Sequence, residues 1–453
     1  MEFVDRIDEM ARLKAALNRT APSFVAIYGR RRVGKSALIQ RALGDGDIYY
    51  LATEVDAALQ RELVAKTASS VFEGLDIVSY NDWESLLLAI NFRVTEKFTL
   101  CFDEFPYMVR TSPELPSVIQ KMVDSHVLKY NLIVCGSSQQ SMYSLLLDST
   151  SPIYGRADLL MKVNPLRIPF IQEALQLTPI ESVENFAVLG GVPRYWCVRE
   201  AYGSLEDMLW SELFHVNGTL YEEAGRLLRD DVKDPVKAST ILSYVGTGSA
   251  KVSEIASRCG EPSTNLSRPL AKLIELGYLK KDIPFGENEK NAKKSLYKVS
   301  DSFFGIYYKY LVPFRSFIEM GRTAPLKNAF ENTFSDHVGM VWEDICRDAV
   351  SGNVIDGVAY GKASRWWRSV NRDLTVEVDV VAESIDHRLL LVGECKWTNE
   401  ENAMSLLNEL EEKVKYMPFA AGRKIVPAFF LKKKPQHPTG FELYPAQVLA
   451  MSR

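Results

Sequence analysis

The sequence lacks the features of a secreted or membrane-spanning protein. Its six cysteines are scattered over 453 residues and form no C-x-x-C pair, which argues against a disulfide framework and against a zinc site. No apolar run approaches the roughly 18 residues of a membrane span. The N-terminal stretch MEFVDRIDEM is acidic and mixed in character, unlike a signal peptide. We therefore expect a cytoplasmic protein with reduced thiols and no membrane partner.

An excess of positive charge is absent too. The chain has 54 basic and 58 acidic residues, with a formal net charge of −4, so any nucleic-acid surface must be local. Hydrophobic residues make up 47 % of the chain and charged residues 25 %, which is the balance of a globular protein. At about 150 residues per domain, this length predicts about three domains.

The segment FVAIYGRRRVGKSALIQRAL, residues 24–43, contains the pattern G-x-x-x-x-G-K-[ST] between a strand pattern and a helical one. Glycines at both ends allow the backbone to fold around phosphates with its N–H groups pointing inward. We expect Lys35 to reach the β- and γ-phosphates of ATP and Ser36 to bind Mg²⁺. The residues predicted to bind the nucleotide are Gly29, Arg30, Arg31, Arg32, Val33, Gly34, Lys35 and Ser36. The three arginines are less informative, since they could simply be solvated.

The stretch FTLCFDEFPYM, residues 98–108, supplies the acids that a phosphate loop needs for hydrolysis. Its apolar strand pattern ends in Asp103, predicted to hold Mg²⁺, and Glu104, predicted to polarise the attacking water. The alternative is a surface acidic pair after an edge strand, and the apolar run that leads directly into the acids argues against it.

A third strand pattern, LIVC, ends in Gly136, Ser137 and Ser138. The carboxyl ends of parallel strands face the ligand in open α/β sheets. Ser137 or Ser138 could therefore sense the γ-phosphate, or could cap the following helix. The sequence leaves these two roles equally open.

The order of the motifs FVDRIDEMARL, YGRRRVGKSAL, LCFDEFPYM, VCGSSQQSM, SPIYGRA, NPLRIPF and GGVPRYW resembles the archaeal-type ATPases of the AAA+/STAND group. The resemblance implies an α/β P-loop NTPase domain over residues 1–165 and a helical lid over residues 166–230. It also implies that Asp5-Arg6 lies near the adenine.

The same resemblance implies roles for two further residues. Arg156, in SPIYGRA, would face the γ-phosphate, and Pro193, in GGVPRYW, would lie in the lid near the base. An arginine in that place could neutralise charge in the transition state. It could equally be a structural salt-bridge partner.

Residues 231–320 show the pattern of a winged-helix domain. We expect a first helix that starts near Pro235 and a short second helix with Ser253 as N-cap and Gly260 at its end. A longer third helix and then two strands follow. Residues 236–300 carry 11 basic and 6 acidic residues, a net charge of +5, which leaves −9 for the rest of the chain. A basic unit on an acidic chain is what local DNA binding requires.

The side chains expected to face DNA are Ser263, Thr264, Asn265, Ser267, Arg268 and Lys272 on the longer helix, and Lys290, Lys293 and Lys294 on the wing. Alternatively, the unit serves only as a protein-docking or lid module with solvated charges. Pro269 inside the longer helix weakens the DNA interpretation, because it removes a backbone donor.

Residues 325–453 carry a second set of acids. In DLTVEVDVVAES, polar residues up to Asp379 alternate with valines, so we expect Val376, Val378 and Val380 to share one face. The strand HRLLLVGECKW ends in Glu394 and Lys396, which point to the same face. An Asp and a Glu on neighbouring strands can share a divalent cation beside a lysine that orients water. Alternatively, one of the two acids forms a cross-strand salt bridge with the lysine.

This arrangement resembles the PD-(D/E)XK nuclease fold, although Val378 stands where a proline is typical. The resemblance implies a restriction-endonuclease-like α/β domain in which Asp379, Glu394 and Lys396 are catalytic. Glu343, on the first helix, would join Asp379 and Glu394 in binding Mg²⁺, with Mn²⁺ as an alternative.

We therefore predict an ATP-hydrolysing protein that acts at DNA, with a C-terminal domain resembling metal-dependent deoxyribonucleases. The alternatives are a STAND-type nucleotide switch and a DNA-binding regulator whose C-terminal domain binds a partner without cleavage. The acid at position 104 favours hydrolysis over a switch. The DNA substrate, and whether the partner is a second copy or another protein, are left open.

Overall fold

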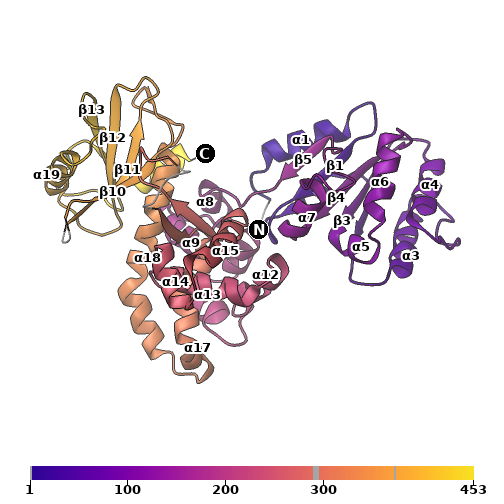
Figure 1. Ribbon diagram of the computed structural model, residues 1–453, viewed down its shortest axis with the longest axis horizontal. Helices are drawn as coiled ribbons and strands as arrows, with labels where there is room; N and C mark the ends of the chain where they lie inside the picture. Colours follow the sequence, from indigo (N-terminus) through magenta and orange to yellow (C-terminus); the bar gives the residue numbers. More distant parts are fainter. Residues whose placement is uncertain (1–2, 289–294, 372–373, 453) are drawn as a thin grey trace.

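The computed structural model describes residues 3–288, 295–371 and 374–452. An N-terminal α/β domain, a helical middle unit and a C-terminal sheet domain follow one another along its longest axis (Figure 1). Within the described ranges, no helix is long and apolar enough to cross a membrane. The wing lysines Lys290, Lys293 and Lys294 lie outside the described residues.

The N-terminal domain contains a parallel sheet of five strands in the order β2-β3-β4-β1-β5. Three of its strands are buried almost throughout, as expected for strands covered on both faces. The strands are β1 (Phe24–Tyr28), β2 (Ile48–Leu51), β3 (Thr99–Asp103), β4 (Asn131–Gly136) and β5 (Leu159–Lys162). The carboxyl ends of β1, β3 and β4 therefore meet at one edge of the sheet, as predicted.

Helices cover both faces of this sheet. Side chains of α1 (Ile7–Leu17) and α2 (Lys35–Ala42) share one core with it. The helices α3 (Ala57–Ala68), α4 (Trp83–Arg93), α5 (Phe105–Thr111), α6 (Leu115–Asp124) and α7 (Gln139–Leu146) contribute to a second core on the other face. Both cores contain only residues of the N-terminal domain.

The first part of the middle unit is helical, as the sequence predicts. Its elements are α8 (Pro169–Leu175), α9 (Pro179–Leu189), α10 (Pro193–Glu200), α11 (Leu205–Met208), the π-helix η1 (Leu209–Leu213) and α12 (Glu223–Asp231). The chain passes from β5 into this unit where the Leu166 amide donates to the Gly191 carbonyl at 2.7 Å. A Cβ at Gly191 would lie 1.9 Å from the Leu166 oxygen, so only glycine fits at this crossing.

A helix-turn-helix follows, formed by α13 (Pro235–Gly246), α14 (Val252–Cys259) and α15 (Ser263–Glu275), with a hairpin of β6 (Leu279–Asp282) and β7 (Leu296–Val299). The predicted start at Pro235 and the glycine that ends α14 are confirmed, and Gly260 has φ 67°. The prediction of Ser253 as N-cap is wrong. α14 already starts at Val252, and Glu254 accepts hydrogen bonds from the Ala250 and Lys251 amides instead.

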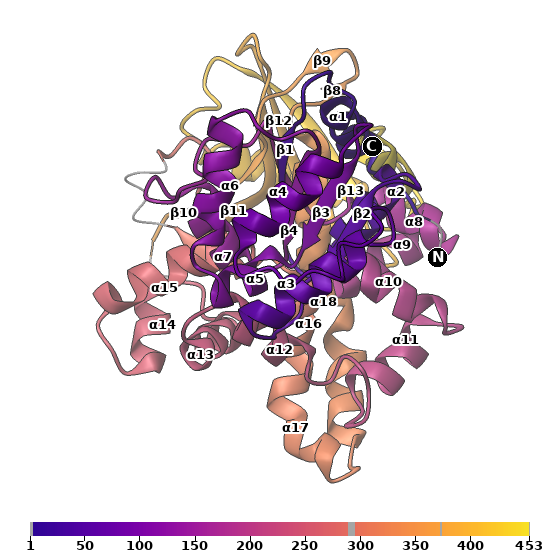
Figure 2. The ribbon, with the colours of Figure 1, turned by 90° about the vertical axis from the view of Figure 1, so that its right-hand side faces the viewer.

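Further helices connect this unit to the C-terminal sheet: α16 (Ser302–Ile306), the π-helix η2 (Tyr307–Leu311), α17 (Val312–Glu319) and the long α18 (Ala324–Val350). α17 and the N-terminal part of α18 project together from the molecule (Figures 1 and 2). One hydrophobic core runs from the middle unit through α18 into the C-terminal sheet. The predicted boundary at residue 325 therefore does not divide two separate cores.

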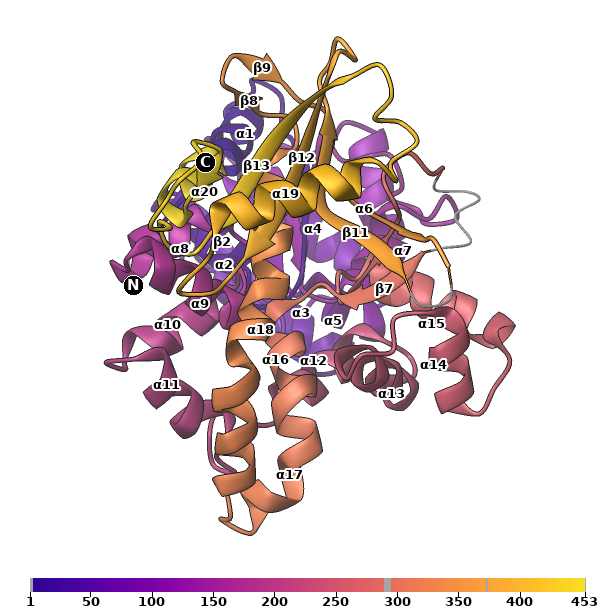
Figure 3. The same ribbon diagram turned by 90° about the vertical axis from the view of Figure 1, so that its left-hand side faces the viewer.

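The C-terminal domain has a mixed sheet in the order β10-β11-β12-β13-β14. Its elements are the small hairpin β8 (Val354–Ile355) and β9 (Val358–Ala359), then β10 (Ser364–Ser369), β11 (Thr375–Glu383), β12 (Leu389–Lys396), α19 (Ala403–Val414), β13 (Lys424–Leu431), β14 (Glu442–Leu443) and α20 (Pro445–Met451). α19 covers the outer face of this sheet (Figure 3). α18 packs on the other face.

The predicted regular alternation along β11 is wrong. Val376 and Val378 pack in the core beneath α19, whereas Val380 packs in the core on the α18 side. Ser364 pairs with Val381 and Trp366 with Val378, so β11 has one residue more than β10 over this stretch. Such a bulge turns the following side chains to the other face, and Asp379 lies within it.

Candidate functional site

A cavity of about 620 Å³ lies at the carboxyl edge of the N-terminal sheet, where the predicted nucleotide site should be. Its lining includes the second half of the phosphate loop, the strand-end acid Glu104, and the first turn of α10. The lining residues are Phe3, Val4, Arg6, Arg31, Arg32, Val33, Gly34, Lys35, Ser36, Ala37, Arg41, Glu104, Ser137, Leu166, Pro193, Arg194 and Cys197.

The phosphate loop curls around the Lys35 ammonium. Lys35 Nζ donates to the carbonyl oxygens of Gly29 and Arg30, both at 2.9 Å. Gly34, with φ 93°, turns the chain into the first residue of α2. Burial lowers the pKa of Lys35, an effect that nearby acids oppose, so an anion in the cavity would be a better partner than carbonyl oxygens.

The two predicted Mg²⁺ ligands of this site touch each other. Ser36 Oγ donates to Asp103 Oδ2 at 2.6 Å, and Asp103 is buried. Tyr49 Oη, from β2, donates to the same carboxylate oxygen. A hydroxyl and a carboxylate are oxygen ligands of the kind that Mg²⁺ prefers, so these residues fit the predicted ion. Tyr49 was not predicted, because a single tyrosine in a short strand carries no motif.

Glu104 lies between the sheet and the cavity. It adopts φ 54°, a conformation that is uncommon for a residue with a side chain and is often found at functional sites. Its Oε2 accepts from the Ser137 amide at 3.2 Å. Ser138 caps α7 by accepting from the Ser141 amide, whereas the buried Ser137 hydroxyl has no hydrogen-bond partner among the described residues. Of the two serines, Ser137 is the one that lines the cavity.

The structure does not bring Arg156 to this cavity. Its guanidinium forms a bidentate ion pair with Asp124, with Nε at 2.8 Å and Nη2 at 3.0 Å, and it is not among the described residues that line the cavity. Pro193, by contrast, lies on the wall at the start of α10. Arg194 and Cys197, on that same wall, were missed, although their position just after Pro193 is a usable signal.

The three consecutive arginines of the loop are not simply solvated. Each forms an ion pair with a different acid of the middle unit. Arg30 binds Asp301, the N-cap of α16, Arg31 binds Asp230 at 3.0 Å, and Arg32 binds Glu223 at 2.6 Å. The phosphate loop therefore joins the N-terminal domain to the helices that carry the helix-turn-helix.

The second candidate site lies in the C-terminal domain, where acids from three elements gather. Burial and the charge of Asp379 raise the pKa of Glu343 on α18, and they raise the pKa of Glu394 on β12 to about 7. Asp379 itself accepts from the Cys395 amide at 2.9 Å. Asp379 is thus close enough to both Glu343 and Glu394 to repel each of them.

Cations already surround these acids. Lys413, on α19, donates to the buried Glu394 at 2.7 Å, and Lys396 lies 4.0 Å from the same carboxylate. Across the ranges that the structure describes, no group of three or more His, Cys, Asp or Glu side chains is arranged to hold a metal ion. The oxygen ligands suit Mg²⁺ or Mn²⁺, but such an ion would first have to replace Lys413 beside Glu394.

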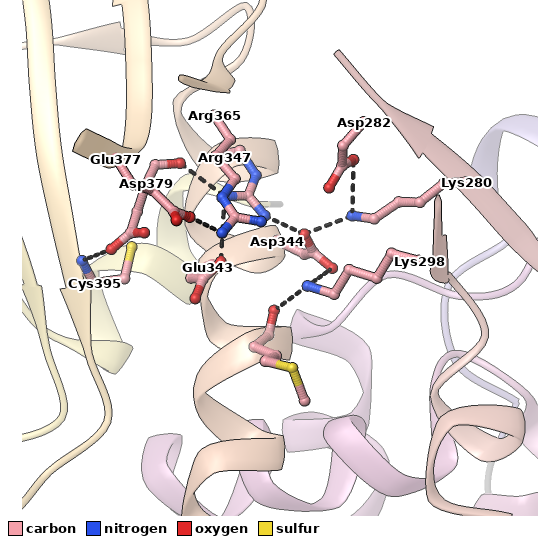
Figure 4. Close-up of polar contacts among 11 residues, drawn as sticks. Lys280, Asp282, Lys298, Glu343, Asp344, Arg347, Arg365, Glu377, Asp379 and Cys395 are labelled. Carbon is pink, nitrogen blue, oxygen red and sulfur yellow. Dashed lines mark hydrogen bonds and ion pairs between the residues drawn. The ribbon is translucent and has the colours of Figure 1, made fainter. Parts of the chain in front are cut away.

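A network of charges connects this site to the wing strands (Figure 4). Arg347 donates to the Asp379 carbonyl at 2.7 Å and also pairs with Asp344 on the same helix. Asp344 binds Lys280 of β6 at 2.5 Å and Lys298 of β7 at 3.1 Å. The base of the wing is therefore held against α18 at Asp344, the residue next to Glu343.

Family models match three parts of the chain. An ATPase domain predominantly from Archaea matches residues 3–196, an IclR helix-turn-helix domain matches residues 235–282, and a domain described as archaeal and bacterial proteins of unknown function matches residues 307–407. The chain therefore carries a P-loop ATPase domain and a helix-turn-helix domain. The last match names no activity, so the nuclease assignment stays a prediction.

Three proteins of archaea are similar to this chain over most of its length. An uncharacterised protein of Methanocaldococcus jannaschii, MJECL04, is 28% identical over 402 residues, which is 87% of each chain. The Walker-type ATPase PABY2304 of Pyrococcus abyssi is 20% identical, with a TM-score of 0.49, over 68% of this chain and 96% of its own. The ORC2 protein of Aeropyrum pernix is 14% identical, with a TM-score of 0.47, over 71% of this chain and 96% of its own.

The raised pKa of Glu394 predicts that the stability of the fold depends on pH. A carboxyl group that holds its proton more tightly in the folded state stabilises the fold at low pH, and that stabilisation is lost as the pH rises from about 4.5 through about 7. E394Q removes the titration, so the fall in melting temperature between about pH 5 and pH 8 should be smaller than in the wild type. The control is E62Q, at an exposed position of α3. An equal fall in E394Q and the wild type would contradict the assignment.

Proposed function

We propose that the protein binds and hydrolyses ATP with Mg²⁺, and that it couples this cycle to DNA held by the helix-turn-helix domain. One observation carries the proposal: Lys35, Ser36 and Glu104 line a single cavity, and Asp103 is bonded to Ser36 behind it. These are the parts that phosphoryl transfer to water requires, namely a charge on the phosphates, metal ligands and a group that orients water.

Each residue has a definite task in this mechanism. Lys35 releases the carbonyl oxygens of the loop and binds phosphate oxygens instead. Its buried ammonium group then has a negatively charged partner. Mg²⁺, when bound, neutralises charge on the β- and γ-phosphates. Glu104 orients the attacking water and accepts its proton, while the Ser137 hydroxyl is available to a γ-phosphate oxygen.

Loss of Lys35 should abolish this activity. We expect K35A to remove detectable ATP binding and to lower the turnover rate roughly 100-fold or more, because the loop loses its charge on the phosphates. Binding of a fluorescent ATP analogue and release of phosphate measure the two effects. K66A, at an exposed position of α3, is the control. Unchanged ATP turnover in K35A would rule out the phosphate-loop assignment.

DNA binding is proposed to use α15. The N-terminal half of α15 exposes Asn265 and Arg268, while Leu266 and Leu270 on the other side are buried. Helix-turn-helix proteins contact base edges with this part of the second helix. At the base of the wing, Lys280 and Lys298 both form ion pairs with Asp344.

R268A should weaken the binding of duplex DNA roughly 10-fold and reduce its dependence on salt, because one cation–DNA contact is lost. Fluorescence anisotropy at several salt concentrations measures both effects. K327A, which removes an exposed lysine of α18, is expected to bind like the wild type. Equal affinity of R268A and the wild type would argue that this unit only docks protein.

A second candidate function, a metal-dependent deoxyribonuclease, is favoured by the crowding of Glu343, Asp379 and Glu394. A divalent cation would relieve the repulsion that raises the pKa of two of them. Lys396 would then orient the water that attacks a phosphodiester. The alternative is a domain that binds a partner without cleavage, in which Lys413 permanently neutralises Glu394.

If the domain is a nuclease, D379A and K396A should each abolish Mg²⁺- or Mn²⁺-dependent cleavage of DNA and leave ATP turnover intact. The assay compares duplex, single-stranded and branched DNA, with and without ATP. D386A, at an exposed turn between β11 and β12, is the matched control. The absence of cleavage by the wild type on all substrates would leave the non-cleaving alternative.

A further inference from the structure

The ion pairs of the three loop arginines differ in how far their two partners are buried. Arg30 is enclosed, with a side-chain exposure of 7 %, and Asp301 binds it in a pocket formed with the rings of Tyr278 and Phe304. The ring centroids lie 5.0 and 5.4 Å from its guanidinium carbon. A cation held by a buried acid and two aromatic rings is costly to move, and Arg30 is not among the described residues that line the cavity, so it acts as an anchor.

Arg32 is also an anchor, for a different reason. Its partner Glu223 is fully buried, and Glu223 additionally accepts from Tyr195 Oη at 3.2 Å. If Arg32 moved to a phosphate, a carboxylate would remain buried without its cation, which is strongly unfavourable. Arg32 therefore stays with Glu223 although part of it lines the cavity.

Arg31 can leave its partner without stranding a buried carboxylate. It and its partner Asp230 are both about one-third exposed, so water can solvate Asp230 when the pair separates. Its other contact is Tyr107 Oη at 2.9 Å. Arg31 lines the cavity together with Lys35 and Glu104, and it lies near enough to Glu104 for the two charges to interact.

We propose that Arg31 is the arginine that stabilises the γ-phosphoryl group during hydrolysis. This inference rests on the proposed ATPase function. Water attacks the γ-phosphorus and gives its proton to Glu104, the bond between the γ-phosphorus and the β,γ-bridging oxygen breaks, and ADP and phosphate form. Arg31 leaves Asp230 and binds the oxygens on which negative charge accumulates.

This assignment differs from the one that the family resemblance implies. Arg156 is held by two hydrogen bonds to Asp124 away from the cavity, whereas Arg31 is part of the cavity wall. Arg31 would also link ATP hydrolysis to the contact between the phosphate loop and α12. When Arg31 exchanges Asp230 for phosphate, α12 loses one of its contacts with the loop and keeps the one through Glu223.

The test separates ATP binding from stabilisation of the transferring group. R31A should bind ATP within about threefold of the wild type but lose at least about 100-fold in kcat. R31A should also fail to form the complex with ADP, Mg²⁺ and aluminium fluoride, which occupies the place of the transferring phosphoryl group. R31K should retain part of the activity. D230N should form that complex at least as tightly as the wild type, because a competing carboxylate is gone.

R19A, at a surface arginine paired with Asp158, controls for the loss of an exposed ion pair. An unchanged kcat in R31A, or loss of the aluminium fluoride complex in R156A with retention in R31A, would overturn the inference. A loss of ATP binding in R31A as large as that in K35A would also overturn it, since Arg31 would then only bind the ground state. If the wild type itself does not hydrolyse ATP, the proposed function fails before this question arises.

Discussion

The arrangement of this protein depends on the ion pairs that the phosphate loop forms with the middle unit. Arg30 and Asp301 are both almost enclosed, and Arg32 pairs with the fully buried Glu223, so the loss of either arginine leaves an acid without its cation. The loop that would hold a triphosphate is thereby fixed to two helices outside its own domain. Any shift of the loop around a nucleotide must be accommodated at this junction.

The other junctions of the molecule are of a different kind. The cores of the N-terminal domain are closed within that domain, whereas the middle unit and the C-terminal sheet share a continuous core. Trp342 also donates to the Phe430 carbonyl, and His337 bonds the Ala187 carbonyl. Apolar cores resist sliding more than polar contacts do. The helix-turn-helix and the C-terminal domain therefore belong to one packed body, whereas the ATPase domain has cores of its own.

The sequence predicted the parts whose chemistry requires a fixed spacing. The phosphate loop, the strand that ends in Asp103 and Glu104, and the helix-turn-helix all follow local patterns that the structure contains. What it could not predict depends on contacts between distant segments. The partners of Arg30, Arg31 and Arg32 come from about 190 to 270 residues away. The bulge that reorients β11 at Asp379 arises from its pairing with β10, which no alternation of residues records.

Hydrogen exchange with and without Mg²⁺ and a non-hydrolysable ATP analogue tests the central claim most directly, namely that the loop transmits nucleotide binding to the middle unit. The account predicts altered amide protection in the loop and also in α12 and at the start of α16, with β12 and β13 unchanged. Protection confined to the loop and α2, with α12 and α16 unaffected, would contradict it.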